Sequence, residues 1–243
     1  MSLGKVEFWT EGKRSLGSGS LVHSSGYAIV ATAAHCVFDW KNKKFNEYIS
    51  FYPYAHNLEF SYSPTEIVLP KIWIEQSAVE YDTAFLVFST NAMKEFNYHD
   101  LALPVAFNLH KNLNYTVHGF PNRFWPSKKP CFNSGKAVDD SFLNSSLQGI
   151  SSKNKSGMSG GPWITLHEGK AIQNSTTSLS ISSSKNVLWG TYWGDTIQKA
   201  YQVASGILMN DSQVVTHKPR KGGDKNVIQP TKRKCPKVTK DGE

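Results

Sequence analysis

The sequence predicts an all-β protein, because short β-rich segments recur along the chain and clear helical periodicity is almost absent. Clusters of Gly, Pro, Asn or Ser separate many of these segments, as expected where strands end in turns. The candidate strands are 6–9, 19–23, 27–32, 48–52, 67–69, 84–88, 115–120, 135–138, 162–165, 187–193 and 202–208. The candidate helices are a turn after His35 and a stretch near 91–96. Many short strands at this spacing are typical of barrels or sandwiches.

The composition supports a folded chain without a membrane helix or a metal centre. Of 243 residues, 39% are hydrophobic and 12% are aromatic, which excludes a wholly disordered protein. No segment approaches the roughly 20 apolar residues that a membrane helix needs. Residues 1–11 lack the apolar core of a signal peptide, so we expect a cytosolic chain or a mature or cloned segment whose export signal was removed. The three cysteines form no C-x-x-C pair, so no metal site is expected.

The strand-rich segments fall into two halves that meet at a break around residues 97–112. Within the second half, residues 174–184 are polar and rich in Ser and Thr. This composition favours a surface loop or a hairpin tip.

The last 33 residues carry much of the positive charge. Residues 211–243 hold nine Lys or Arg against four acids, in a chain whose net charge is +8. Three prolines and the lack of apolar periodicity predict a disordered tail. A solvated tail is the usual meaning of such a segment, and contact with nucleic acid or an anionic surface is the alternative.

Two segments of the first half place a chemically useful side chain next to an apolar strand. His35 ends the run Ala-Thr-Ala-Ala-His, and small residues before a histidine allow other backbone to approach it. Asp82 stands just before the apolar segment 84–88. A lone histidine is usually structural, and a lone aspartate usually caps a turn. The functional alternative is a buried carboxylate that orients an imidazole.

The second half contains a serine flanked by three glycines, in Gly-Met-Ser-Gly-Gly-Pro-Trp from Gly157 to Trp163. Glycine permits backbone conformations that other residues avoid, so such a loop can aim several N–H groups at one point, as an oxyanion hole requires. A flexible linker is the alternative, and the Pro-Trp pair and the neighbouring strands argue against it.

The same loop satisfies G-x-S-x-G, the nucleophile elbow of α/β-hydrolases. That fold needs a helix directly after the serine and a chain order of Ser, Asp and His. Here Gly160, Gly161 and Pro162 would break a helix, and the histidine and aspartate both precede the serine. The α/β-hydrolase alternative is therefore disfavoured.

Taken together and in this order, T-A-A-H-C, D-x-A-x-L and G-x-S-G-G-P resemble the chymotrypsin-like serine proteases. The resemblance covers about residues 4–210 and is greatest to bacterial trypsin-like and glutamyl-endopeptidase-like members. It implies two six-stranded antiparallel β-barrels with the active site between them. The barrels would span 4–96 and 113–210, joined by a linker at 97–112 and followed by the basic tail at 211–243.

The resemblance also implies the catalytic roles. His35, Asp82 and Ser159 would form the catalytic triad, in which the histidine takes the serine proton and the aspartate orients the imidazole. The backbone N–H groups of Gly157 and Ser159 would form the oxyanion hole. No metal or cofactor is implied.

Substrate-binding residues follow from the same resemblance. Tyr192, Trp193 and Gly194 would pair with the substrate backbone as an added strand. Lys153 would lie at the base of the specificity pocket. Because a lysine there repels like charge, we expect cleavage after Lys or Arg to be disfavoured.

The chain departs from the family at two positions. The cysteine that would pair with Cys36 is replaced by Gly17, so Cys36 and Cys131 are both expected to be free thiols. Met158 stands where trypsin-type enzymes carry the aspartate that pairs with a newly released N-terminus. The nucleophile loop is therefore expected to be preformed or to be ordered by another contact.

These observations predict a monomeric, secreted serine endopeptidase that hydrolyses protein or peptide substrates through an acyl-enzyme. Two alternatives remain at this stage. The first is an inactive protease homologue that binds peptides. The second is a viral polyprotein-processing protease whose basic tail binds nucleic acid.

Overall fold

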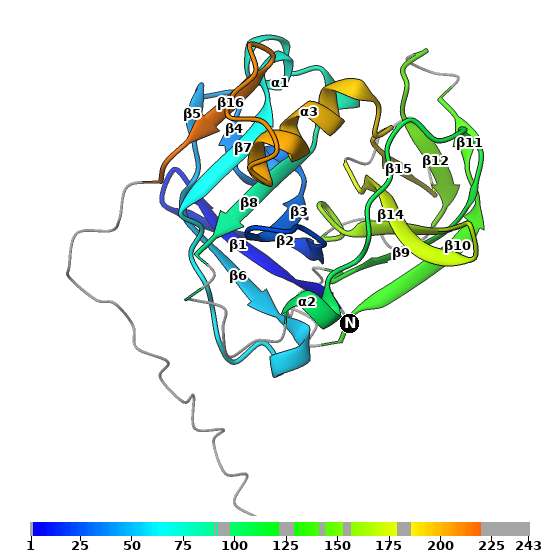
Figure 1. The fold of residues 1–243 in the computed structure, drawn as a ribbon, viewed down its shortest axis with the longest axis horizontal. Helices are drawn as coiled ribbons and strands as arrows, with labels where there is room; N and C mark the ends of the chain where they lie inside the picture. The colour runs from blue at the N-terminus through cyan, green and yellow to red at the C-terminus, as the bar shows by residue number, and fades with distance from the viewer. Residues whose placement is uncertain are drawn as a thin grey trace, which may run out of the picture.

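The all-β prediction is confirmed, and the strands form two lobes that lie side by side (Figure 1). The structure is a computed structural model. It describes residues 2–89, 91, 98–121, 129–140, 144–152, 157–178 and 186–219.

The first lobe is built on an antiparallel barrel whose strands are neighbours in the order β6-β1-β2-β3-β8-β7. An isolated bridge between Phe51 and Tyr62 places the segment that precedes β7 against β6. This bridge narrows the gap between β6 and β7, the first and last strands of that order. Inward-facing residues of these strands, such as Val6, Leu21 and Phe51, are fully or almost fully buried. The strands are β1 (Leu3–Thr10), β2 (Lys13–Val22), β3 (Ala28–Thr32), β6 (Glu47–Pro53), β7 (Glu66–Pro70) and β8 (Ala84–Phe88), with the small hairpin β4 (Phe38–Asp39) and β5 (Lys44–Phe45) beside them.

The second lobe is also a ring of antiparallel strands. One sheet has the order β10-β9-β13-β14 and the other β11-β12-β15. The ring closes because β11 follows β10 after Ala137 and because Thr177, after β14, bridges to Gly190 of β15. The strands are β9 (Asn114–Gly119), β10 (Cys131–Lys136), β11 (Val138–Asp139), β12 (Gln148–Ser151), β13 (Pro162–His167), β14 (Lys170–Thr176) and β15 (Val187–Gly190).

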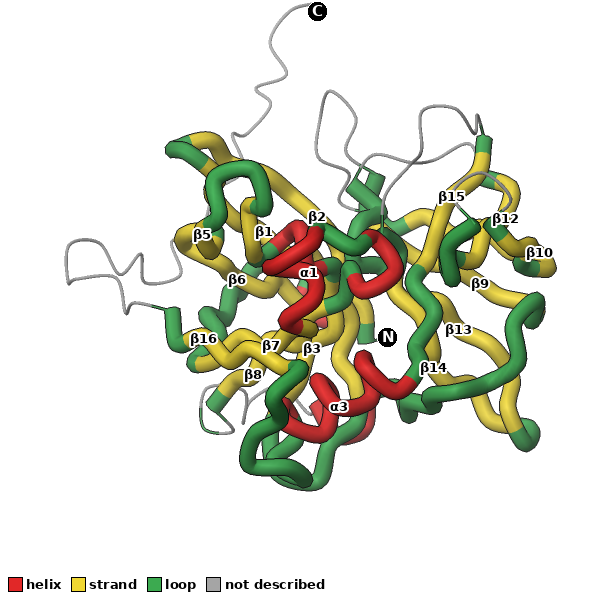
Figure 2. Tube along the Cα trace, turned by 90° about the horizontal axis from the view of Figure 1, so that it is seen from above, coloured by secondary structure: helices red, strands yellow, loops and turns green. Residues whose placement is uncertain are grey.

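Helices are short and lie at the margins of the barrels (Figure 2). They are the 3-10 turns η1 (Ala34–Cys36), η2 (Tyr54–His56) and η3 (Val79–Tyr81) and the α-helices α1 (Lys71–Gln76), α2 (Tyr98–Leu101) and α3 (Asp195–Ala204). The turn expected after His35 corresponds to η1, which contains that histidine. The helix expected near 91–96 falls largely outside the described residues.

The strand expected at 202–208 is wrong, because most of this region belongs to helix α3 and the turns that follow it. Ile197, Ala200 and Ala204 are buried at the spacing of one helix face. That face packs against β7 and β8 of the first barrel. The second barrel therefore ends at β15, and the expected range of 113–210 included a helix that covers the first barrel.

The expected start of the disordered tail at Asp211 is also wrong. The segment β16 (Val214–His217) pairs with β7 as an edge strand, with Val215 opposite Leu69. The His217 ring stacks on Phe45 at a centroid distance of 3.8 Å. The adjacent residues Val214 and Val215 pack against the two core clusters of the first barrel, and the basic composition of the tail obscured this apolar surface. Residues 220–243 lie outside the described residues.

The surface loop expected at 174–184 is partly wrong. Asn174–Thr176 belong to β14, and the residues from Asn174 to Ser178 are all buried although all are polar. Residues 179–185 lie outside the described residues.

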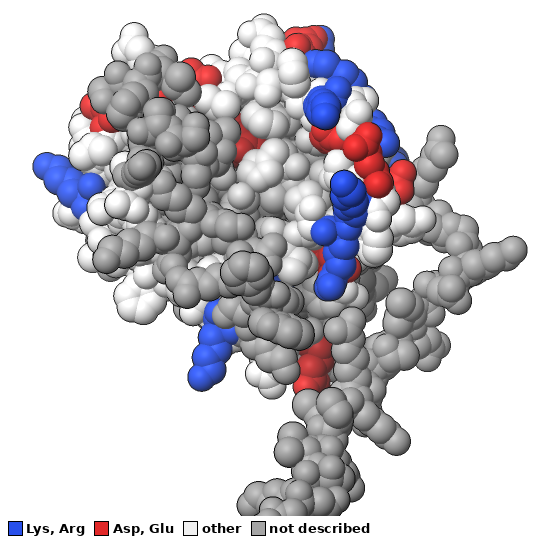
Figure 3. Space-filling model, turned by 180° about the vertical axis from the view of Figure 1, so that it is seen from behind, with Lys and Arg blue, Asp and Glu red and all other residues white. Residues whose placement is uncertain are grey.

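Among the described residues on the face seen in Figure 3, Lys and Arg side chains are interspersed with Asp and Glu. Within the described residues, no helix is both long and apolar enough to cross a membrane.

Candidate active site

Strand pairing within the first barrel brings His35 and Asp82 together. β3 and β8 are antiparallel, and Thr32 at the end of β3 pairs with Ala84 at the start of β8. His35 follows Thr32 by one tight turn, and Asp82 precedes Ala84 by two residues, so both lie at the same edge of the sheet. The His35 Nδ1 atom is 2.7 Å from Asp82 Oδ2, and the His35 backbone N–H donates to Asp82 Oδ1 at 2.8 Å.

The electrostatics of this pair suit a base. Asp82 is fully buried, whereas 34% of the His35 side chain is exposed. Burial lowers the pKa of His35, but the Asp82 carboxylate outweighs burial and raises the pKa of His35 well above 6.5. Burial raises the pKa of Asp82, but His35 and the hydrogen bonds to the carboxylate leave that pKa below its ordinary value. The carboxylate therefore stays ionised and stabilises a protonated imidazole.

Sequence reasoning missed Ser178, the third partner of this carboxylate. Ser178 Oγ donates to Asp82 Oδ2 at 2.5 Å from the end of β14 in the second barrel. The Ser178 N–H is itself held by Trp189 O at 2.9 Å. The polar run from Asn174 to Ser178 was the available signal, since such a run is unusual in a buried strand and indicates a polar partner.

Ser159 lies in the turn between β12 and β13, in the segment Gly157–Gly161, here called the nucleophile loop. The Gly161 N–H donates to Met158 O at 2.9 Å and closes a turn around Ser159 and Gly160. Gly160 has a φ of +82°, a conformation that favours glycine at the third position of a turn. A side chain there would also clash with Ser18 O and Thr32 Oγ1. A side chain at Gly161 would likewise clash with His118 O, so local geometry requires both glycines after the serine.

The nucleophile loop packs on the part of the first barrel that carries His35. The Ser18 N–H donates to Ser159 O at 2.7 Å, and a Cβ at Gly160 would come within 2.9 Å of the Ala33 backbone nitrogen. Ser159 therefore lies on the same side of the molecule as the turn that contains His35. No hydrogen bond joins Ser159 Oγ to the His35 ring in the described chain, so the expected contact of about 2.6–3.2 Å stays a prediction.

The N–H groups of the nucleophile loop divide into two sets. Those of Gly160 and Gly161 donate to Thr177 O and Met158 O. Those of Gly157 and Ser159, the pair predicted for the oxyanion hole, donate to no acceptor among the described residues. Gly157 has a φ of +83°, which places it in the left-handed region as well.

The expected pairing of Tyr192, Trp193 and Gly194 with a substrate strand stays a prediction, and the surroundings of these residues disfavour it. The Trp193 side chain is 1% exposed and stacks on Phe107 under helix α3. The carbonyl oxygens of all three residues already accept hydrogen bonds. The Gly194 N–H donates to Tyr192 O, the Asn108 N–H donates to Trp193 O, and the Gln198 N–H donates to Gly194 O. A carbonyl oxygen can accept a second hydrogen bond, but a substrate strand would share these acceptors with the bonds already made. Lys153, the other expected substrate-binding residue, lies outside the described residues.

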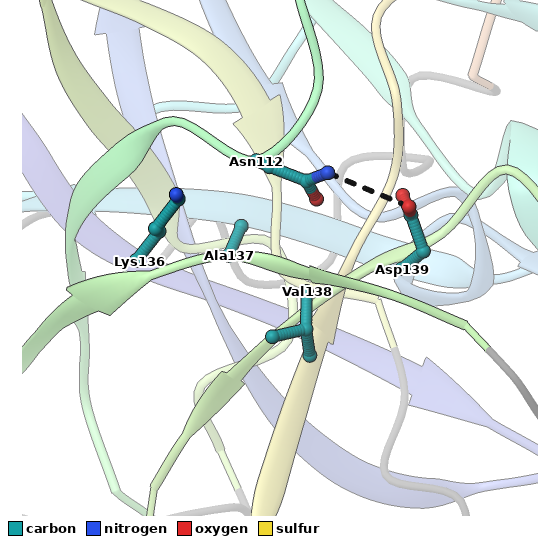
Figure 4. A pocket seen from close by; sticks show the side chains of 5 residues that line it. All are labelled: Asn112, Lys136, Ala137, Val138 and Asp139. Atoms are coloured by element: carbon teal, nitrogen blue, oxygen red, sulfur yellow. Dashed lines mark hydrogen bonds between the residues drawn. The ribbon is translucent and has the colours of Figure 1, made fainter.

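A hollow of about 340 Å³ adjoins His35. It is lined by Thr10, His35, Phe38, Asp39, Trp40, Lys41, Asn46, Trp73 and Ser77. A second hollow, of about 380 Å³, lies on the second barrel around Asn112 and the segment Lys136–Asp139 (Figure 4). There Asn112 Nδ2 donates to Asp139 Oδ2 at 3.4 Å. The lining of this second hollow also includes Lys136 but no histidine or serine, so of the two hollows the first is the one that adjoins His35.

The described residues contain no cluster of three His, Cys, Asp or Glu side chains that could hold a metal ion. No disulfide joins Cys36 to Cys131 among the described residues, and the expectation that both are free thiols stays a prediction. Cys36 is buried beside Gly17, whereas Cys131 begins β10 and contacts Met158 Sδ at 3.9 Å.

Solved structures of proteases share this architecture. The thermostable serine protease AL20 from an extremophilic microorganism is 30% identical, with a TM-score of 0.75 over 85% of this chain and 98% of that chain. The protease Anisep from Arthrobacter nicotinovorans is 27% identical, with a TM-score of 0.74 over 84% of this chain and 95% of that chain. A Glu endopeptidase shares the fold at 18% identity, with a TM-score of 0.64 over 83% of this chain and 90% of that chain. No protein-family model and no curated protein matches the chain.

Proposed function

The chain belongs to the trypsin-like serine proteases of the chymotrypsin fold, and from that premise we propose that it is a serine endopeptidase with His35, Asp82 and Ser159 as its catalytic triad. The observation that carries the proposal is the hydrogen bond of 2.7 Å between His35 Nδ1 and the buried Asp82 carboxylate. A carboxylate on Nδ1 holds the imidazole in the tautomer that leaves Nε2 free to accept a proton.

The chemistry follows from these positions. His35 takes the Ser159 hydroxyl proton as the oxygen attacks the scissile carbonyl carbon, and it then gives that proton to the leaving amine. An ester of Ser159 remains. Water, activated by His35 in the same way, attacks this ester and releases the carboxylic acid. The Asp82 carboxylate stabilises the imidazolium that forms in each half-reaction.

The oxyanion hole in this proposal is formed by the N–H groups of Gly157 and Ser159. This assignment is supported because, within the described residues, neither of these two N–H groups donates to an acceptor. The neighbouring N–H groups of Gly160 and Gly161, in contrast, already donate to carbonyl oxygens. Each donor aimed at the developing negative oxygen is worth about 3–4 kcal/mol of the barrier.

The proposed substrates are proteins or peptides that carry no Lys or Arg before the scissile bond. This preference rests on the sequence position of Lys153, since a basic side chain in a water-poor pocket would meet a like charge. We further propose that the enzyme acts outside the cell, which fractionation of the producing cells into medium and cell extract would test.

The proposal is tested by incubating the protein with a peptide library and reading the cut sites by mass spectrometry. We expect cuts that disappear in Ser159→Ala, a small change in a loop that leaves the fold intact. Cuts that persist in this variant would come from a contaminant or another nucleophile. A wild-type protein that binds peptides without cutting them would support the inactive homologue instead.

A further inference from the structure

Ser18, in β2 of the first barrel, contacts the nucleophile loop of the second barrel through both its backbone and its side chain. The Ser18 N–H donates to Ser159 O at 2.7 Å, and Ser18 Oγ donates to Gly157 O at 2.9 Å. The Phe120 N–H donates in turn to Ser18 Oγ at 2.9 Å. One hydroxyl thus joins the first barrel to two segments of the second.

The hydroxyl of Ser18 has a fixed direction. A serine hydroxyl carries one hydrogen and two lone pairs, so accepting from Phe120 N leaves its hydrogen for Gly157 O. The Ser18 carbonyl is also bonded, since it accepts from Thr32 Oγ1 at 2.8 Å. Ser18 is fully buried, so water does not compete for these partners.

These contacts determine how the nucleophile loop is oriented. The carbonyls of Gly157 and Ser159 are held by Ser18, and the carbonyl of Met158 is held by the Gly161 N–H. Peptide groups are planar with the C=O and N–H on opposite sides. Because each C=O shares its plane with the N–H of the next residue, fixing the carbonyls of residues 157, 158 and 159 also fixes the N–H groups of residues 158, 159 and 160. One of these is the Ser159 N–H of the proposed oxyanion hole.

The residue next to the nucleophile cannot supply this order through charge. Met158 is 0% exposed and packs in the core of the second barrel with Tyr115 and Trp163. A Cβ at Gly119 would lie only 3.0 Å from Met158 Cα, so the backbone of the loop rests directly on β9. A thioether forms no ion pair, and the polar contacts of the loop come from elsewhere.

We propose that Ser18 is a positioning residue that holds the nucleophile loop in its oxyanion-binding shape through hydrogen bonds from the first barrel. The inference rests on the proposed function for its catalytic consequence. Ser18 touches neither substrate nor reacting atoms, and it acts through the carbonyls of Gly157 and Ser159.

Ser18→Ala tests the proposal, with Ser20→Ala as the matched control. Both serines are fully buried in β2, and Ser20 Oγ donates to Gln173 Oε1 at 2.7 Å, away from the nucleophile loop. Ser20→Ala leaves Gln173 Oε1 without its donor, whereas Ser18→Ala leaves Gly157 O without its donor and Phe120 N–H without its acceptor. A purely structural role therefore predicts a larger loss of melting temperature in Ser18→Ala, but kcat close to that of wild type in both variants well below their melting temperatures.

The first measurement is steady-state hydrolysis well below both melting temperatures. We expect kcat to fall about 10- to 100-fold in Ser18→Ala, a part of what the loss of an oxyanion donor costs, with KM changed by less than about threefold. Ser20→Ala should keep kcat within about threefold of wild type. Equal kcat values in the two variants, or a loss that lies only in KM, would overturn the proposal.

The second measurement, amide hydrogen exchange over residues 157–161, does not depend on peptidase activity. We expect faster exchange in Ser18→Ala than in wild type or Ser20→Ala. Unchanged exchange would overturn the role of Ser18. Faster exchange in a protein that cuts no peptide would instead overturn the proposed function. If Ser18→Ala does not fold, Ser18→Cys replaces it, because a cysteine fills the space of the serine side chain but forms weaker hydrogen bonds. The same two measurements are then made on Ser18→Cys, and the same results would overturn the proposal.

Discussion

The His35–Asp82 pair and the nucleophile loop are the two halves of the proposed site, and different parts of the molecule hold them. The pair is set mainly by pairing of β3 and β8 within one sheet and by two hydrogen bonds from His35 to the Asp82 carboxylate, which also accepts one bond from Ser178 of the second barrel. The nucleophile loop, in contrast, is ordered by contacts between the barrels, chiefly from Ser18, 139 positions away in the chain.

This difference separates local from long-range specification. A strand pairing places residues next to its ends whatever their identity, so the first half depends on few side chains. The second half depends on backbone carbonyls, and only a donor at the right place in another element can satisfy them. We therefore expect changes in the first half to alter proton transfer and changes in the second half to alter oxyanion stabilisation.

The largest expected effect comes from Asp82→Asn. The amide favours the wrong imidazole tautomer, so kcat should fall by about 10⁴-fold. The pH profile should change as well. In wild type, kcat/KM should rise with pH through a pKa above 6.5, because His35 must be neutral to act as a base and Asp82 raises its pKa. Without the negative charge, the pKa of His35 drops and this rise should move to lower pH.

The profile is measured with one peptide substrate between about pH 5 and pH 9. If kcat/KM rises at the same pH in wild type and in Asp82→Asn, Asp82 does not control the pKa of His35. That result would contradict the role proposed for the His35–Asp82 pair.

Gly17→Cys should stabilise the first half and shift the second only slightly. A Cβ at Gly17 would lie 2.8 Å from Cys36 Sγ, within reach of a disulfide. Closing a loop of this length contributes about 2–3 kcal/mol to the free energy of unfolding. The same Cβ would lie 3.0 Å from Ser159 O, so the loop must move slightly, and kcat/KM should stay within about threefold.

Urea unfolding of the oxidised variant, with the reduced variant as its own control, measures the stabilisation. A thiol count that shows no crosslink after oxidation would contradict the placement of Gly17 beside Cys36. A large loss of activity on crosslinking would show that the two halves are more tightly coupled than the contacts indicate.

Ser178→Ala should remove the hydrogen bond that the second barrel donates to Asp82. A hydrogen bond to a charged group contributes about 1.5–3 kcal/mol, whereas the control Ser205→Ala, which loses a bond to the neutral carbonyl of Gln202, should cost about 0.5–1.5 kcal/mol. Ser178 helps to lower the pKa of Asp82. Its contribution to stability should therefore be complete above the ordinary carboxylate pKa of about 3.9 and be lost as the pH falls through the lowered pKa.

Urea unfolding at pH 7 and at successively lower pH measures this dependence. Equal losses of unfolding free energy in Ser178→Ala and Ser205→Ala at pH 7 would indicate that the buried carboxylate does not need its third donor.

The smallest effect on activity should come from truncation before Asp211, which removes β16 and its pairing with β7. We expect the melting temperature to fall by about 4–8 °C, as a loss of roughly 2 kcal/mol produces in a chain of this size. Truncation after Pro219 retains β16 and should lower the melting temperature less. Turnover at low temperature should not change in either, since β16 contacts neither half of the site. Equal melting temperatures would show that β16 adds no stability.

The sequence predicted most of the first half of the site and much of the fold. Alternating apolar strands and the short spacing of His35 and Asp82 from their strands are local patterns, and local patterns are visible in a sequence. Helix α3 was missed because only Ile197, Ala200 and Ala204 mark its buried face. β16 was missed because basic and proline-rich residues follow it.

The contributions of Ser18 and Ser178 could not be predicted from the sequence, because each depends on a partner in the other barrel. A serine is common and carries no periodic signal, and its role appears only when the fold places an acceptor beside it. The segment Tyr192–Gly194 illustrates the same limit. Its sequence favours pairing with a substrate strand, but only the fold reveals that the N–H groups of Gly194, Asn108 and Gln198 already donate to its carbonyls.

The most direct test of the central claim is labelling of the folded protein with a fluorophosphonate, followed by intact mass measurement and peptide mapping. The reagent needs an activated serine and an oxyanion hole together. We predict one adduct per molecule, located on Ser159, formed at a rate that rises with pH through a pKa above 6.5 and absent from Ser159→Ala. A folded protein that takes up no label, or takes it up at another serine, would contradict the proposed active site.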